Sequence, residues 1–167
     1  MKKKIMLLAI SVIIILLAYS FFTFPNKEKI KNNLINKYSE SVTPDKKNFD
    51  SLVKIELNQN QSILLNETKT AKIYNNLLPL FYHKFELNET EKILKIICDS
   101  TNYKWGEIGT PFYDKTIILF DKNKNEIGYI DISLDGQIDM FPNLAITKWG
   151  LLTNKGFKEL VIATRTE

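Results

Sequence analysis

An uncharged run near the N-terminus constrains this chain more than any other feature. Residues 5–24 contain no Asp, Glu, Lys or Arg, and Ser11, Ser20 and Thr23 are the polar exceptions. As a helix, a run of this length reaches about 30 Å, the thickness of the hydrocarbon core of a bilayer. Lysines precede the run at positions 2–4, and Pro25 follows it. We therefore predict a signal-anchor transmembrane helix in residues 1–25 and a single extracytoplasmic domain in residues 26–167.

A cleaved signal peptide is the alternative for the same run. The lysines, the apolar core and a small-residue site at Ala18-Tyr19-Ser20 fit such a peptide, which would leave a secreted or periplasmic protein after cleavage near Ser20. The apolar run continues past Ser20 to Phe24, and this favours the uncleaved anchor. The lysines before the run favour a cytoplasmic N-terminus. The expected location is a cell membrane, crossed once by residues 5–24. The Lys-, Asn- and Ile-rich composition is typical of an AT-rich bacterial genome, so we expect this membrane to be bacterial.

The charge of the remaining chain excludes several classes of partner. Removing the lysines at 2–4 from the 23 basic residues leaves 20 against 19 acidic ones, so the domain is close to neutral. A nucleic-acid-binding domain would carry a basic stripe, and none is visible. Cys98 is the only cysteine, which excludes an internal disulfide and lipoprotein processing after the apolar run. We expect no cofactor and no nucleic-acid partner.

Periodicity predicts helices and strands along the domain. Asn66 and Asn88 resemble helix N-caps, and the helix after Asn88 should bury Cys98 on its apolar face. The segment 102–112 is expected to be a loop. For the C-terminal segment 153–164 the pattern slightly favours a helix over a strand. The other expected elements are a helix over 27–38, strands over 53–57, 62–65 and 81–87, and a helix from 66 to about 78.

The strongest β pattern lies between residues 116 and 141. An apolar strand over 116–120 should pair with 127–133, which should turn back into 137–141. A three-residue loop with Gly136 in the left-handed conformation places Ile132 opposite Ile138 and keeps one face apolar. A two-residue loop would place Ile132 opposite Asp139 instead. We choose the first register, and the predicted fold class is α+β, with a small antiparallel sheet packed against two or three helices.

The chosen register places Asp131 opposite Asp139, on the polar face of the hairpin beside Tyr129. Like charges directly opposite one another destabilise a sheet unless a cation, a raised pKa or an acid–base role relieves the repulsion. The favoured interpretation is a solvated polar face, for which Asp131→Asn should be neutral or slightly stabilising. The alternative is a metal site or a catalytic acid–base pair.

Aromatic residues in Gly- and Pro-broken segments provide a second candidate surface. Tyr103, Trp105 and Trp149 are the members that we select, because exposed aromatic residues on loops often form contact surfaces. Plugging the ends of a sheet is the commoner role of such residues. Asp121 opens a segment that resembles a calcium loop, but Glu126 stands where that loop needs glycine. His83, the only histidine, has no metal-ligand partner at a suitable spacing.

These patterns favour a non-enzymatic function. We expect a membrane-tethered extracytoplasmic domain of binding or accessory type, with a protein or cell-envelope partner and with an inhibitor- or immunity-like role as one form of it. No catalytic, cofactor-binding or metal-ligating residue is assigned. The alternative is an envelope-polymer hydrolase or a metal-binding domain that uses Asp131 and Asp139.

Overall fold

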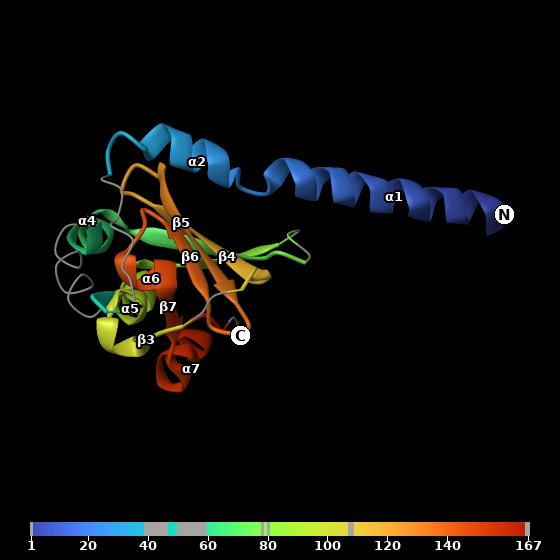
Figure 1. Ribbon diagram of the computed structural model, residues 1–167. Coiled ribbons are helices and arrows are strands. Elements are labelled where there is room, and N and C mark those ends of the chain that lie inside the picture. Colours follow the sequence, from blue (N-terminus) through green and yellow to red (C-terminus); the bar gives the residue numbers. More distant parts are fainter. Residues whose placement is uncertain are drawn as a thin grey trace.

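A computed structural model of the chain shows an α+β fold with a small antiparallel sheet and several helices (Figure 1). It describes residues 2–38, 47–49, 60–77, 79, 81–106 and 109–165, and at residues 2, 20–23, 60–63, 145 and 149 it describes the backbone alone. The strand predicted over 53–57 lies outside these residues.

The main sheet has five strands in the order β2-β1-β4-β5-β6, and all its neighbours are antiparallel. A second sheet pairs β3 with β7. The strands are β1 (Thr70–Asn75), β2 (Tyr82–Phe85), β3 (Tyr103–Trp105), β4 (Tyr113–Phe120), β5 (Glu126–Ser133), β6 (Ile138–Phe141) and β7 (Gly150–Leu152).

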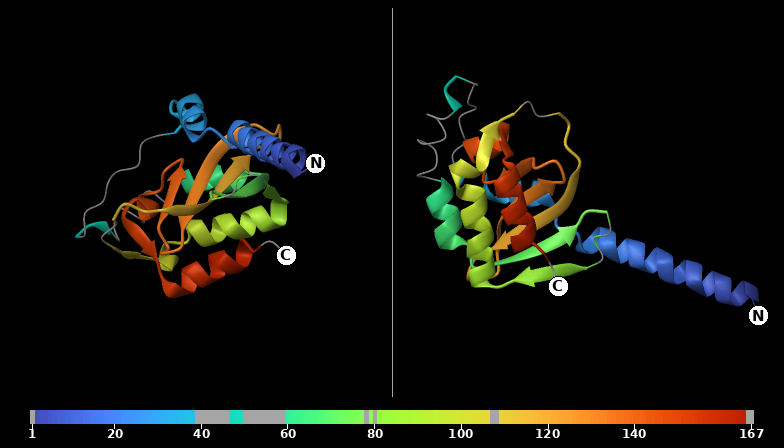
Figure 2. Two further views of the ribbon diagram at one scale, coloured as in Figure 1. Left: turned by 90° about the vertical axis from the view of Figure 1, so that its right-hand side faces the viewer. Right: turned by 90° about the horizontal axis from the view of Figure 1, so that it is seen from below.

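Helices lie on both faces of the main sheet (Figure 2). The larger hydrophobic core lies between the sheet and α5 and α7, and a smaller cluster of Ile30, Tyr74 and Ile118 lies beneath α2 on the opposite face. We call the α2 side the outer face. The helices are α1 (Lys2–Thr23), α2 (Lys27–Leu34), α4 (Asn60–Glu67), α5 (Leu87–Cys98), α6 (Ala145–Trp149) and α7 (Asn154–Ala163), with a short 3-10 helix, η1 (Ser100–Asn102).

The predicted hairpin register is confirmed. Asp131 pairs with Asp139, and Ile132 pairs with Ile138. Gly136 has a φ of +85°, the left-handed conformation that glycine adopts without a steric penalty. The turn is closed by a hydrogen bond of 3.2 Å from the Gly136 amide to the Ser133 carbonyl. Local turn chemistry and the apolar alternation therefore agree on one pairing.

The predicted helix from 66 to 78 is wrong, because residues 70–75 form β1. This strand pairs with β2 on one side and β4 on the other, and its alternate residues Ala71 and Ile73 are buried. The hydrogen bonds that it makes to two neighbouring strands outweigh the helical spacing of its apolar residues. The strand predicted over 62–65 is also wrong, since these residues lie in α4.

The other differences concern the ends of elements and one additional short strand. The helix predicted after Asn88 begins one residue earlier, at Leu87, and its cap is a capping box between Glu86 and Glu89. The segment expected as a loop after Asn102 contains β3, which pairs with β7. The C-terminal segment forms the helix α7, with Thr153 as its N-cap.

Helix α1 extends away from the rest of the molecule and has its N-terminus at the far end (Figure 1). From Ile5 to Tyr19 its apolar side chains are exposed on every side, as Leu8 at 68 % and Ile15 at 65 % illustrate. Among the residues that the structure describes, no helix combines the length and the apolarity required to cross a membrane.

Candidate functional site

Asp131 lies at the centre of a polar cluster on the outer face of the sheet. It stands between Thr116 of β4 and Asp139 of β6 in one cross-strand row, and it is only 2 % exposed. Its Oδ2 accepts a hydrogen bond of 2.7 Å from the Nζ of Lys27, and its Oδ1 accepts one from the Thr116 hydroxyl. Both carboxylate oxygens are therefore engaged. The expectation that Asp131 is solvated is wrong, because α2 covers it.

Helix α2 brings Lys27 to this carboxylate. Asn26 caps the helix by accepting a hydrogen bond of 2.9 Å from the Lys29 amide, so that Lys27 is the first helical residue. One turn later, Ile30 is buried at 1 % exposure and packs on the apolar part of the outer face. Lys27 also lies 5.8 Å from the centre of the Tyr129 ring. The ion pair and the apolar contact together fasten α2 to the sheet.

Asp139 has a different environment from its partner across the strands. Its side chain is exposed, yet partial desolvation, and then the charge of Asp131, raise its pKa above the ordinary aspartate value. The half-buried Tyr129 and Tyr113 lie beside the pair, and burial, followed by the charges of Asp139 and Asp131, raises the pKa of each to about 12. Asp131 is thus ion-paired with Lys27, whereas Asp139 is weakly repelled by the charge of Asp131.

Asp139→Asn is expected to stabilise the protein by a few tenths of a kcal/mol at neutral pH, because it removes the repulsion across the strands. Because the pKa of Asp139 is raised in the folded state, protonation of this carboxyl stabilises the folded protein at acidic pH. This stabilisation is lost as the pH rises through the folded-state pKa of Asp139. The gain in the variant should therefore vanish below the unfolded-state pKa of an aspartate. Urea unfolding of both proteins across the acidic range measures this difference, and a gain that is independent of pH would contradict it.

No metal site is apparent near the pair. Over the described ranges, no group of three His, Cys, Asp or Glu side chains is placed to hold a metal ion. His83 is exposed on β2, and its ring lies edge-on to Phe85 at 5.0 Å. Because Asp131 is buried with both oxygens engaged, the arrangement is suited to docking a helix and poorly suited to proton transfer.

The selected aromatic residues do not form one surface. Tyr103 is buried at 7 % exposure in β3, so its selection as a surface residue is wrong, and the pairing of β3 with β7 is the reason. Trp105 is half-buried and packs edge-on against Phe49 with ring centres 5.5 Å apart. Trp149 lies in α6, and its side chain is among those that the structure does not describe. Tyr129 stacks on Phe141 instead, beside Asp131.

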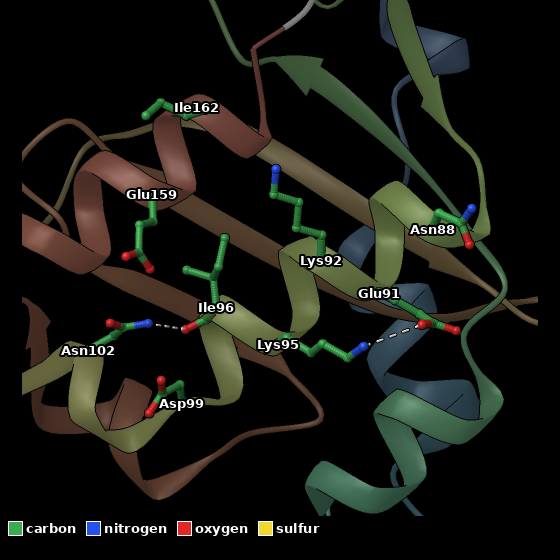
Figure 3. A pocket seen from close by; sticks show the side chains of 9 residues that line it. All are labelled: Asn88, Glu91, Lys92, Lys95, Ile96, Asp99, Asn102, Glu159 and Ile162. Carbon is green, nitrogen blue, oxygen red and sulfur yellow. Dashed lines mark hydrogen bonds and ion pairs between the residues drawn. The ribbon is translucent and has the colours of Figure 1, made fainter.

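A groove between α5 and α7 is the second candidate site (Figure 3). Its volume is about 530 Å³. Lys92 and Ile96 of α5 point toward α7, Glu159 of α7 points back toward α5, and Ile162 lies at the far edge of α7. The apolar side chains of the groove are thus flanked by charges of both signs. The residues that line it are Asn88, Glu91, Lys92, Lys95, Ile96, Asp99, Asn102, Glu159 and Ile162.

The groove is held in shape by contacts at its edges. The Nδ2 of the buried Asn102 donates a hydrogen bond of 3.0 Å to the Ile96 carbonyl at the end of α5. The Asn102 carbonyl accepts one of 2.7 Å from the Thr153 amide at the start of α7. Gly156 allows the close approach, because a Cβ there would lie 2.7 Å from the Cβ of Asn102. The η1 segment therefore sets the spacing of the two helices.

No protein-family model, curated protein or solved structure matches the chain. Sequence reasoning missed the groove because the charged residues of α5 look like an ordinary solvated helix face. The sequence carries no direct signal of this surface, and the structure is needed to show that Val161 and Ile162 of α7 are exposed, at 45 % and 65 %.

Cys98 lies on the opposite, buried side of α5, as the helical pattern predicts, with 1 % exposure. Burial raises the pKa of its thiol to about 12, so that almost no thiolate forms near neutral pH. The native protein should resist alkylation and react only on unfolding in urea, and Cys98→Ala should cost about 1–2 kcal/mol, as for a small buried apolar group. A mass-spectrometric labelling time course measures this, and rapid labelling without urea would contradict it.

Proposed function

We propose that this chain is a membrane-tethered extracytoplasmic domain that binds a protein or cell-envelope component in the groove between α5 and α7. The role is of binding or accessory type, as in an inhibitor or immunity protein, and needs no catalysis. The observation that carries the proposal is the groove itself, in which Ile96 and Ile162 are accessible between charged side chains.

The chemistry of the groove favours a polypeptide segment as the bound group. Segments that bind between helices place apolar anchors on the floor and polar groups at the rim. Lys92 on one wall and Glu159 on the other call for a partner with charges of both signs. The lining residues include no arginine, the residue best suited to bidentate binding of phosphate or carboxylate. A peptide with alternating apolar and charged residues meets these requirements.

The tether rests on the sequence of residues 5–24. These residues are uncharged and follow three lysines, which favours insertion with the N-terminus in the cytoplasm. The side chains exposed around α1 would be poorly placed in water, and a lipid environment would bury them. Against the tether stands the finding that no described helix is long and apolar enough to cross a membrane.

The alternative of an envelope-polymer hydrolase or a metal-binding domain that uses Asp131 and Asp139 is the weaker proposal. An acid–base or metal-ligating carboxylate must reach its substrate or ion. Asp131 is buried beneath α2 and already accepts hydrogen bonds from Lys27 and Thr116. Loss of α2 from the sheet would be needed before this carboxylate could act.

Site-specific photo-crosslinking tests the binding proposal. A benzoylphenylalanine in place of Ile162 should give a discrete adduct in intact membranes of the native host, and Lys92→Glu in the same protein should abolish it by reversing a charge at the rim. The matched control is the same amino acid in place of Lys122, which is exposed in the turn between β4 and β5. Equal adducts from both positions, or insensitivity to Lys92→Glu, would contradict binding in the groove.

A reporter fusion tests the tether. Alkaline phosphatase fused after Glu167 should be active, because the C-terminal domain is expected outside the cytoplasm, and the mature protein should retain residues 1–24. Activity of a cytoplasm-only reporter at the same position would contradict the orientation. A mature mass that begins at Phe21 would instead identify a cleaved signal peptide.

A further inference from the structure

Exposed apolar side chains gather at one end of the five-stranded sheet. Outside α1, the four most exposed large apolar side chains that the structure describes are Phe81 at 82 %, Leu77 at 76 %, Leu134 at 75 % and Phe112 at 72 %. We call these residues the apolar end. Single exposed apolar residues are common on protein surfaces, whereas several gathered at one end indicate a contact.

The pairing of the strands places these residues together. Leu77 follows β1, and Phe81 precedes β2, its hairpin partner. Phe112 precedes β4 and Leu134 follows β5, and the first residue of β4 pairs with the last of β5. Asp114 joins two of these segments. Its backbone carbonyl accepts a hydrogen bond of 2.8 Å from the Asn76 amide, and its side-chain Oδ2 accepts one of 2.8 Å from the Leu134 amide.

Helix α1 leaves the domain at the same end. Phe24, just after α1, packs edge-on against Tyr74 near the end of β1 with ring centres 5.8 Å apart, and Tyr74 lies 5.6 Å from Tyr82 at the start of β2. The hairpin of β1 and β2 points in the direction in which α1 continues toward the N-terminus, and the views agree on this (Figures 1 and 2). A bilayer that holds α1 would therefore face the apolar end.

We propose that the apolar end rests in the interface of the bilayer that holds α1, with Phe81 and Leu134 inserted at the level of the headgroups. The inference relies on the tether proposed above. Amphipathic aromatic side chains are favoured at this depth, and Tyr82 is 53 % exposed beside Phe81. The sequence from Leu77 to Phe81, Leu-Leu-Pro-Leu-Phe, is apolar throughout.

The charges beside the apolar end indicate which kind of lipid contact it makes. Lys115 stands near it, but Asp114 and Asp135 do as well, so the local charge is not basic. Attraction to anionic headgroups therefore contributes little, and burial of apolar surface is the driving force. The contact would also restrain rotation of the domain about the Pro25 break, and would hold the groove between α5 and α7 in one orientation.

Fluorescence quenching in proteoliposomes tests the inference with the full-length chain. An NBD fluorophore is attached at Phe81→Cys or Leu134→Cys, both on exposed side chains, while the buried Cys98 stays unlabelled. Ile14→Cys in α1 reports on the tether, and Lys122→Cys, at the other end of β4, is the matched control. The vesicles contain phosphatidylcholine, with a fraction carrying a nitroxide near the top of the acyl chain. A parallel set for Ile14→Cys carries the nitroxide near the end of the acyl chain, because Ile14 lies at the middle of the uncharged run.

We expect the nitroxide lipid to lower emission about two-fold at positions 81 and 134, the depth of an interfacial contact, and to leave position 122 unchanged. Replacing half of the lipid by phosphatidylglycerol should not alter this pattern. Quenching at Ile14→Cys without quenching at 81 and 134 would overturn the inference and leave the tether standing. A lack of quenching at Ile14→Cys would overturn the tether and the inference with it. Blue-shifted emission at 81 and 134 without quenching would show that a second copy covers the apolar end, and would also overturn the inference.

Discussion

Asp131→Asn is expected to destabilise the folded domain by about 2 kcal/mol, because it leaves the ammonium group of Lys27 without its partner. Breaking a fully buried ion pair typically costs about 3–5 kcal/mol, and the smaller value applies because solvent reaches the Lys27 side chain, which is 32 % exposed. Urea unfolding of the wild type and the variant at neutral pH measures the difference. Asp139→Asn, on the facing residue of the same row, is the matched control and should not destabilise the protein.

A double-mutant cycle separates the ion pair from the other contacts of Asp131. Lys27→Met keeps an apolar stem over Tyr129 but removes the charge, and it should destabilise the protein because it leaves Asp131 buried and unpaired. The double variant Lys27→Met/Asp131→Asn should be more stable than the sum of the single effects predicts, by about 1 kcal/mol. Strict additivity would show that the two groups do not interact, and would contradict the docking of α2 through this pair.

Gly128→Ala is expected to destabilise the domain by about 3 kcal/mol, at the upper end of the range for added volume in a packed site. Gly128 is buried in β5, and a Cβ there would lie 2.4 Å from the carbonyl oxygen of Phe141 in β6 and 3.2 Å from Pro142. The nearest atom belongs to the backbone, so that relief requires β5 and β6 to separate. The measurement is equilibrium unfolding in urea, together with amide exchange along β6.

Gly109→Ala is the matched control for this substitution. Nothing lies within 4 Å of a Cβ at Gly109, which is exposed, and its replacement should change the free energy of unfolding by less than about 0.5 kcal/mol. Similar effects of the two substitutions would mean that glycine in β5 is not required by close packing against Phe141.

The hairpin of β5 and β6 was predictable because its information is local. Apolar residues alternate on both strands, and Gly136 supplies the turn conformation, so that only one register keeps Ile132 and Ile138 on the same face. Helix α5 was predictable for the same reason, since its apolar residues recur at helical spacing and bury Cys98. In both elements the decisive interactions join residues close in sequence.

The segment that became β1 shows where local evidence fails. Asn66 and the spacing of Ala71, Ile73 and Tyr74 satisfied the requirements of a helix, yet the chain forms a central strand. Its backbone pairs with β2, close in the chain, and with β4, more than 40 residues away at Ile73 and Ile117. Whether such a segment forms a central strand depends on hydrogen bonding and packing with the strands on both sides, and a local pattern does not identify those strands.

The sequence by itself determined the facing of Asp131 and Asp139, the burial of Cys98 and the uncharged run of residues 5–24, because each depends on residues a few positions apart. Only the tertiary structure decided that Lys27, 104 residues before Asp131, neutralises that carboxylate. It also decided that α5 and α7 border a groove, and that Leu77, Phe81, Phe112 and Leu134 share one end of the sheet with the exit of α1. The physical reason is that desolvation and charge pairing depend on distances in space. Strand pairing and helix docking bring together residues that are far apart in the sequence, and a local sequence pattern does not predict these contacts.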